Sequence, residues 1–216
     1  MKRKIKLVIF DLDGTLVNAY AAVVASINFT LRTLGLPLRD RNLIRRSVGW
    51  GDTKLLKRFV GEDAIQKALT IYRRHHAGAL KHGTKFLPGA YPLLQDLKKQ
   101  KYQLAIASNR PTRFSLIILR YLKIRKLFNV VLCADKLKRG KPDPRILKVI
   151  LKKMKVKPQE ALYVGDMTID VETGKRADVK TVAVLTGSST KREVEALRPS
   201  RVIRKISDLR MILKEE

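Results

Sequence analysis

Residues 5–15 read Ile5-Lys6-Leu7-Val8-Ile9-Phe10-Asp11-Leu12-Asp13-Gly14-Thr15, and this stretch decides the fold. Its first six residues form a nearly continuous apolar run, which is typical of a strand buried on both faces of a parallel sheet. The run delivers two carboxylates, Asp11 and Asp13, into a turn that needs glycine. One carboxylate could attack an electrophile while its neighbour handles a proton.

Outward from this stretch, apolar runs of strand length alternate with segments of helical periodicity. Such alternation is typical of an α/β protein, and we predict a Rossmann-like, doubly wound parallel sheet. The predicted strands cover residues 5–10, 102–107, 130–133, 161–164, 181–185 and 202–204. The predicted helices of the core cover residues 91–101, 112–122, 144–154, 169–176 and 190–197.

Residues 18–85 break this alternation, because they contain helical periodicity and no convincing strand. The first helix is expected over residues 19–34, with later breaks at Gly35, Gly49 and Gly61. We therefore predict an inserted α-helical cap domain over 18–85, and a catalytic core formed by 1–17 and 86–216. An insertion after the first strand would lie over the carboxyl ends of the strands, where open α/β sheets bind ligands.

The composition is unusually basic, with 47 Lys and Arg against 19 Asp and Glu and a formal net charge of +28. Such a charge favours phosphorylated substrates, or a nucleic-acid partner, although no named nucleic-acid-binding motif is present. The apolar run after the basic residues 1–4 is interrupted by Asp11 and Asp13, so it does not form a secretion signal. No stretch approaches transmembrane length. We expect a cytoplasmic protein without a membrane partner, and a monomer or homodimer.

Polar residues follow the predicted strands or open a helix in four places. They are Asp11 and Asp13, Ser108 and Asn109, Lys141, and Asp166 and Asp170. Asp166 and Asp170 are four residues apart and would share one face of a helix. If these carboxylates face Asp11, their repulsion calls for a cation, and an all-oxygen cluster suits Mg²⁺. Lys141 and the Ser108 hydroxyl could then bind phosphoryl oxygens.

Two other site types share part of this pattern but fail on spacing. An EF-hand loop that starts at Asp11 needs glutamate at its twelfth position, which is Ala22. A nucleotide P-loop that ends at Lys141 needs Ser or Thr next, and Pro142 stands there. Neither a calcium loop nor a P-loop is therefore expected.

The four segments together resemble the four motifs of the haloacid dehalogenase superfamily. The matching stretches are Asp11-Leu12-Asp13-Gly14-Thr15, Ser108-Asn109, Lys141-Pro142 and Gly165-Asp166-x-x-x-Asp170. The resemblance covers essentially the whole chain, and the insertion resembles that superfamily's helical cap. Val48-Gly49-Trp50-Gly51 and Phe86-Leu87-Pro88-Gly89 look most like phosphoglycolate phosphatase-type members.

The resemblance implies a role for each core residue. Asp11 would be the nucleophile that forms an aspartyl phosphate, and Asp13 the acid and base that serves the leaving alcohol and the water. Mg²⁺ would be held by Asp11, the Asp13 backbone carbonyl and Asp166, with Asp170 in support. The phosphoryl group would be bound by Ser108, Asn109 and Lys141. Because superfamily dehalogenases lack an acid at the position of Asp13, a phosphatase is favoured over a dehalogenase.

Outside the motifs, the sequence is less specific. Arg45, Trp50 and Lys54 in the cap are candidate substrate contacts. Arg110 has no clear family role, and we expect a solvated loop residue rather than a substrate clamp. The three histidines of the cap are expected at the surface or at an interface. They are His75, His76 and His82.

These observations predict a Mg²⁺-dependent phosphatase that hydrolyses small phosphomonoesters, such as phosphoglycolate or a sugar phosphate. Its partner would be a small phosphorylated metabolite. A phosphosugar mutase of the same fold is one alternative, in which the aspartyl phosphate returns to a sugar. A basic nucleic-acid-binding protein on a phosphatase scaffold is an alternative of another class.

Overall fold

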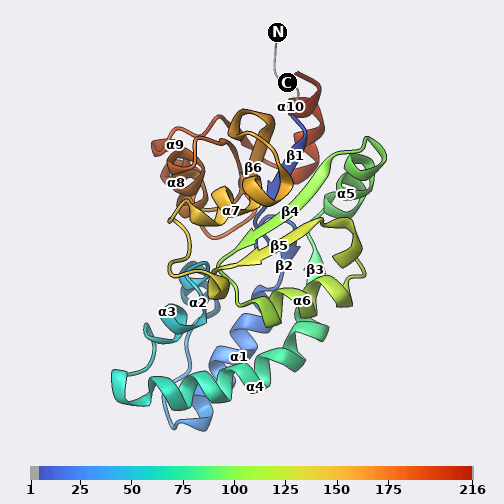
Figure 1. Cartoon of the computed structure of the whole chain (residues 1–216). Helices are drawn as coiled ribbons and strands as arrows, with labels where there is room; N and C mark the ends of the chain where they lie inside the picture. The colour runs from blue at the N-terminus through green and yellow to red at the C-terminus, as the bar shows by residue number, and fades with distance from the viewer. Residues whose placement is uncertain (1–4, 216) are drawn as a thin grey trace.

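The computed structural model describes residues 5–215 and contains a six-stranded parallel sheet in the order β5-β4-β1-β6-β7-β8 (Figure 1). The prediction of an α/β parallel sheet is confirmed. Residues 1–4 and 216 of the predicted core lie outside the described residues. The strands are β1 (Leu7–Phe10), β4 (Gln103–Ser108), β5 (Val130–Cys133), β6 (Ala161–Gly165), β7 (Lys180–Val184) and β8 (Arg201–Ile203).

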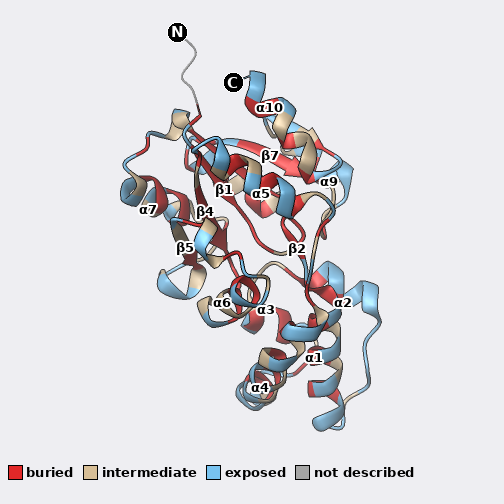
Figure 2. Ribbon diagram, turned by 90° about the vertical axis from the view of Figure 1, so that its right-hand side faces the viewer, coloured by how far each residue is buried: buried red, intermediate tan, exposed pale blue. Residues whose placement is uncertain are grey.

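Helices cover both faces of the sheet, as Figures 1 and 2 show. In β1, Val8 and Phe10 belong to the core cluster on one face, while Leu7 and Ile9 belong to the cluster on the other. Burial on both faces explains why this strand is apolar at every position. The first face is covered by α5 (Ala90–Lys99), α6 (Thr112–Tyr121) and α10 (Leu209–Glu215), and the second by α7 (Arg145–Met154), α8 (Thr168–Arg176) and α9 (Lys191–Ala196).

The insertion forms a separate helical layer beyond one end of the sheet (Figures 1 and 2). It has its own apolar core, which all four of its helices share. The cap helices are α1 (Tyr20–Thr33), α2 (Arg41–Ser47), α3 (Asp52–Leu56) and α4 (Ile65–Gly83). In α4 the buried residues recur at spacings of three or four, as an amphipathic helix requires.

Two short strands join the cap to the core. β2 (Val17–Asn18) pairs with β3 (Lys85–Phe86) in an antiparallel ribbon, so both connections to the cap run side by side. The prediction that residues 18–85 contain no strand missed this ribbon, because two residues are too few to show a period. The last helix, α10, was also not predicted. No helix among residues 5–215 combines the length and the apolar character needed to cross a bilayer.

Candidate active site

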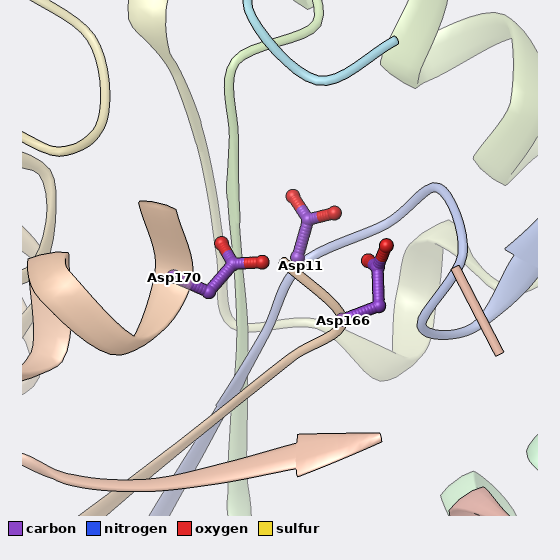
Figure 3. Close-up of side chains that lie close together, drawn as sticks. All are labelled: Asp11, Asp166 and Asp170. Atoms are coloured by element: carbon purple, nitrogen blue, oxygen red, sulfur yellow. The ribbon is translucent and has the colours of Figure 1, made fainter. Parts of the chain in front are cut away.

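Three carboxylates from two distant parts of the sequence meet at the carboxyl end of the sheet (Figure 3). Asp11 follows β1, Asp166 follows β6, and Asp170 lies in the first turn of α8. One oxygen from each lies within 4.8 Å of the others. Because β1 and β6 are parallel neighbours, with Phe10 beside Val164, their ends deliver Asp11 and Asp166 to the same point.

Lys141 lies between two of these carboxylates. Its Nζ is 2.7 Å from Asp11 Oδ1, 2.6 Å from Asp170 Oδ1 and 3.1 Å from the Tyr163 hydroxyl, and the residue is only 4% exposed. Burial opposes the charged amine, but Asp11 and Asp170 outweigh it and raise the pKa of Lys141 above its usual value. Lys141 is therefore a buried ammonium that offsets part of the carboxylate charge.

The acidic cluster carries more negative charge than Lys141 balances. Burial raises the pKa of Asp11 to about 7, although Lys141 acts in the opposite direction. Burial, together with Asp170 and Asp11, also raises the pKa of Asp166. Such shifts mark a site whose ionised form calls for a further cation.

The surroundings of Asp166 hold its carboxylate in one orientation. Thr15 Oγ1 donates to Oδ1 at 2.9 Å, and the backbone N–H of Ser188 donates to Oδ2 at 3.2 Å. A Cβ atom on Gly187 would lie 1.5 Å from Oδ2, and one on Gly14 would lie 2.6 Å from it. Glycine at both positions leaves the space that this carboxylate needs. Oriented oxygen donors with excess negative charge fit Mg²⁺.

Ser108 and Asn109 follow β4 and lie beside this cluster. Ser108 is buried, and its Oγ accepts a hydrogen bond from the Arg110 backbone N–H at 3.2 Å. The Asn109 side chain accepts from the Lys141 N–H at 2.7 Å and donates to the carbonyls of Lys141 and Gly49 at 3.1 and 3.0 Å. Asn109 thus ties the lysine segment to the cap. Its contact with phosphate stays a prediction.

Arg110 is not solvated, and that expectation is wrong. It is 9% exposed, and its guanidinium binds both oxygens of Asp13, with Nε 2.6 Å from Oδ2 and Nη2 2.9 Å from Oδ1. Its Nη1 is 2.7 Å from His76 Nε2. Burial disfavours the guanidinium charge, but Asp13 outweighs it and raises the pKa of Arg110. The arginine and the predicted acid–base residue therefore form a buried bidentate pair.

His76 is fully buried where α4 of the cap meets Arg110 and Phe114 of the core, so the expectation of a surface histidine is wrong for this residue and that of an interface histidine is confirmed. A guanidinium can only donate, so His76 Nε2 accepts and Nδ1 carries the hydrogen. That hydrogen points to Ser26 Oγ at 3.0 Å, and Ser26 donates to the Ala22 carbonyl at 2.7 Å. The spacing of four residues from Tyr72 and from Leu80, both buried, was the signal for burial.

Replacing His76 by glutamine should reduce the acid sensitivity of the fold. Burial, assisted by Arg110, lowers the pKa of His76 from 6.5 to about 2. Below pH 6.5 the unfolded chain binds a proton that the folded protein does not, so this histidine destabilises the fold as pH falls. As pH falls from 6.5 to about 5, the free energy of unfolding of His76→Gln should rise by roughly 2 kcal/mol relative to that of the wild type. Urea unfolding across this range measures the difference, with the exposed His82→Gln as control. If the stability difference between variant and wild type is the same at pH 6.5 and pH 5, His76 does not have a lowered pKa in the folded protein.

The predicted cap contacts lie in two different places. Arg45 Nη2 donates to the Gly187 carbonyl at 2.9 Å, beside the loop that holds Asp166. Lys54 Nζ lies 5.2 Å from the centre of the Trp50 ring, and both residues line an outer cavity. Direct contact of these three residues with a substrate stays a prediction.

Two adjoining cavities separate cap and core. The inner one has a volume of about 570 Å³ and reaches Asp11, Asp13, Ser108, Arg110 and Lys141. The outer one, of about 1250 Å³, adjoins it. Most of the inner wall from the cap is apolar or aromatic. Its cap residues are Tyr20, Val23, Val48, Gly49, Gly51, Asp52, Leu55 and Tyr72. Asp11 and Asp13 thus face a partly open cavity between cap and core that can admit a small molecule.

The known proteins that resemble this chain are named as hydrolases, phosphatases or pyrophosphatases. The family of haloacid dehalogenase-like hydrolases matches residues 8–184. Phosphoglycolate phosphatase 1 of Pseudomonas aeruginosa is 31% identical over 214 residues, which cover 94% of this chain and 78% of that protein. Pyrophosphatase PpaX of Bacillus cereus is 30% identical over 212 residues, with 98% of each chain covered. A crystal structure of a predicted phosphoglycolate phosphatase from Haemophilus somnus has a TM-score of 0.92 at 27% identity, covering 96% of this chain and 97% of that one.

Proposed function

The chain belongs to the haloacid dehalogenase-like hydrolase family, and from that premise we propose a Mg²⁺-dependent phosphatase of small phosphomonoesters. One observation carries the proposal. Lys141 joins Asp11 to Asp170 beside Asp166, at the floor of a cavity that Asp13 also lines. A candidate nucleophile, a candidate acid and a buried cation therefore line one cavity, next to an oxygen-donor cluster.

In the proposed reaction, Asp11 attacks phosphorus through Oδ2, because its Oδ1 is held by Lys141. The new bond joins Asp11 to phosphorus, and the bond from phosphorus to the ester oxygen breaks. Asp13 gives a proton to the departing oxygen and later takes one from the water that releases phosphate. Because both Asp13 oxygens accept from Arg110, one of these hydrogen bonds must open before Asp13 can carry the proton. Lys141 and Ser108 hold phosphoryl oxygens, and the cap excludes bulk water.

The residues that would hold Mg²⁺ are Asp11, Asp166 and the backbone carbonyl of Asp13, with Asp170 in support. When bound, the ion supplies positive charge against the phosphoryl oxygens. The chain's own contribution is to hold the ligands beforehand, through Thr15 and Ser188 on Asp166.

The substrate is proposed to be a small phosphorylated metabolite. Relatives at 30–31% identity are named phosphoglycolate phosphatase and pyrophosphatase, and the first suggests phosphoglycolate as the leading candidate. Such a substrate would lie in the inner cavity, which Asp11, Asp13 and Lys141 line.

Phosphate release from a panel of three phosphate esters and one phosphoanhydride, pyrophosphate, tests this function. The panel contains phosphoglycolate, pyrophosphate, a hexose phosphate and p-nitrophenyl phosphate, each assayed with Mg²⁺ and with a chelator. We expect turnover of at least one member that falls by about 10²-fold or more with chelator, because the carboxylate cluster then lacks its cation. Equal turnover with and without chelator would refute the metal dependence. No turnover of any ester by folded protein would refute the phosphatase.

A further inference from the structure

Arg110 has more hydrogen-bond donors than the described residues use. Its guanidinium carries five N–H hydrogens, of which two go to Asp13 and one to His76. One hydrogen on Nη1 and one on Nη2 have no partner among residues 5–215. Arg110 is 9% exposed and lines the inner cavity, so these two donors belong to a guanidinium that is largely removed from water beside that cavity. Unused donors of a buried charged group are costly unless a ligand accepts them.

The inner cavity has little else that could bind a second negative charge. Among the described residues that line it, the basic side chains are Arg110 and Lys141. Lys141 contacts Asp11, Asp170 and the Tyr163 hydroxyl, and in the proposed reaction its charge serves the reacting phosphoryl group. A substrate that brings a negative charge beyond its reacting phosphate would therefore meet that charge at Arg110.

The position of Arg110 sets how far that charge can lie from the reacting bond. Asp13 must come within hydrogen-bond distance of the ester oxygen in order to protonate it. Arg110 nitrogens lie 2.6 and 2.9 Å from the oxygens of Asp13, so the guanidinium is one contact further out. An anionic group one or two bonds beyond the ester oxygen can contact the Arg110 guanidinium. In a leaving group with a longer carbon chain, the charge lies beyond that guanidinium.

We propose that Arg110 is a specificity-determining residue that binds an anionic group on a short leaving group, and this rests on the phosphatase function proposed above. The group is a carboxylate, as in phosphoglycolate, or a second phosphate, as in pyrophosphate. Arg110 gives its two unused N–H donors to this group, and its hydrogen bond to one Asp13 oxygen opens so that this oxygen can carry the proton. The planar guanidinium suits both anions, since each can accept two hydrogen bonds.

His76 is the positioning residue of this arrangement. It lies on α4 of the cap and accepts from Arg110 Nη1, while Ser26 on α1 holds its other ring nitrogen. The Tyr72 and Phe114 rings flank the imidazole, with centroids 4.7 and 5.0 Å away. The cap thereby sets the orientation of a guanidinium that belongs to the core.

The test compares matched substrates. Phosphoglycolate is paired with hydroxyethyl phosphate, which replaces the carboxylate by a neutral hydroxymethyl group. Pyrophosphate forms a separate arm and distinguishes the phosphate source from the carboxylate source. The variants are Arg110→Met and Arg110→Lys. The control is Arg113→Met, which removes an exposed arginine of α6 that does not line the inner cavity.

Pyrophosphate is an anhydride without a matched neutral ester, so in its arm Arg110→Met should lower kcat/KM by about 10²-fold relative to wild type if the bound group is a phosphate. In the wild type, we expect kcat/KM for phosphoglycolate to exceed that for hydroxyethyl phosphate by about 10²-fold if the bound group is a carboxylate. Arg110→Met should bring this ratio near one, Arg110→Lys should leave an intermediate ratio, and Arg113→Met should keep the wild-type ratio. If Arg110→Met does not fold or turn over, the ratio in Arg110→Lys decides. The inference is overturned, while the phosphatase stands, if the ratio is near one or is preserved by the Arg110 variants and kcat/KM for pyrophosphate is also unchanged in Arg110→Met. Absence of turnover on every ester would instead remove the proposed function.

Discussion

Asp11→Asn is expected to abolish phosphate release, with a fall in kcat of about 10⁴-fold or more. Asparagine has nearly the same shape, but its amide cannot form the covalent bond to phosphorus that Asp11 is proposed to form. Only interactions that bind and orient the ester would remain. The measurement is phosphate release at saturating ester with Mg²⁺.

The fold of this variant should persist. Asp11 is a buried carboxylate whose pKa is raised to about 7 by burial, so a neutral amide at this position avoids that penalty. Thermal unfolding without metal checks the fold, and Asp63→Asn, at an exposed aspartate of the cap, is the matched control. Turnover by folded Asp11→Asn within about tenfold of wild type would exclude Asp11 as the nucleophile.

Lys141→Met is expected to lower the free energy of unfolding by about 3 kcal/mol at pH 8 without metal, the largest loss among the variants proposed. The variant leaves Asp11 and Asp170 buried together without their shared ammonium, and like charges in a poorly solvated site repel. For a chain of this length, such a change lowers Tm by roughly 6–12 °C. Thermal unfolding in the presence of a chelator measures it.

The destabilisation should shrink as pH falls. Asp11 already has a pKa raised to about 7, and loss of Lys141 removes an interaction that lowers it. In the window from about pH 4 to above pH 7 the folded variant takes up protons that the unfolded chain does not, so stability falls as pH rises. Lys138→Met, at an exposed lysine three residues earlier, is the control. A Tm for Lys141→Met within about 2 °C of wild type would contradict the role of the ammonium.

The sheet and the acidic residues after its first strand could be predicted because each depends on residues that are close together in the sequence. Continuous apolar runs indicate burial on two faces, and β1 places Leu7 and Val8 in opposite core clusters. Parallel strands end at the same edge of a sheet, so residues that follow β1 and β6 must meet there. The proximity of Asp11 and Asp166 could therefore be predicted without knowing the conformation of any loop.

Predictions failed where a residue's surroundings come from distant parts of the chain. Arg110 and Asp13 are 97 residues apart, and His76 lies 34 residues from Arg110. An arginine in a polar loop is normally solvated. Burying its charge costs too much free energy unless a counter-ion lies within contact distance. Nothing near Arg110 in the sequence indicates that Asp13 provides it.

The sequence by itself determined the strand and helix pattern, the helical insertion and the residue types at the carboxyl end of the sheet, because each depends on local periodicity or spacing. The tertiary structure alone decided which groups share a proton or a charge. It joined Arg110 to Asp13 and His76, and Asn109 to Gly49 of the cap. Hydrogen bonds and ion pairs act over about 3 Å, and only the folded chain brings these atoms within that distance.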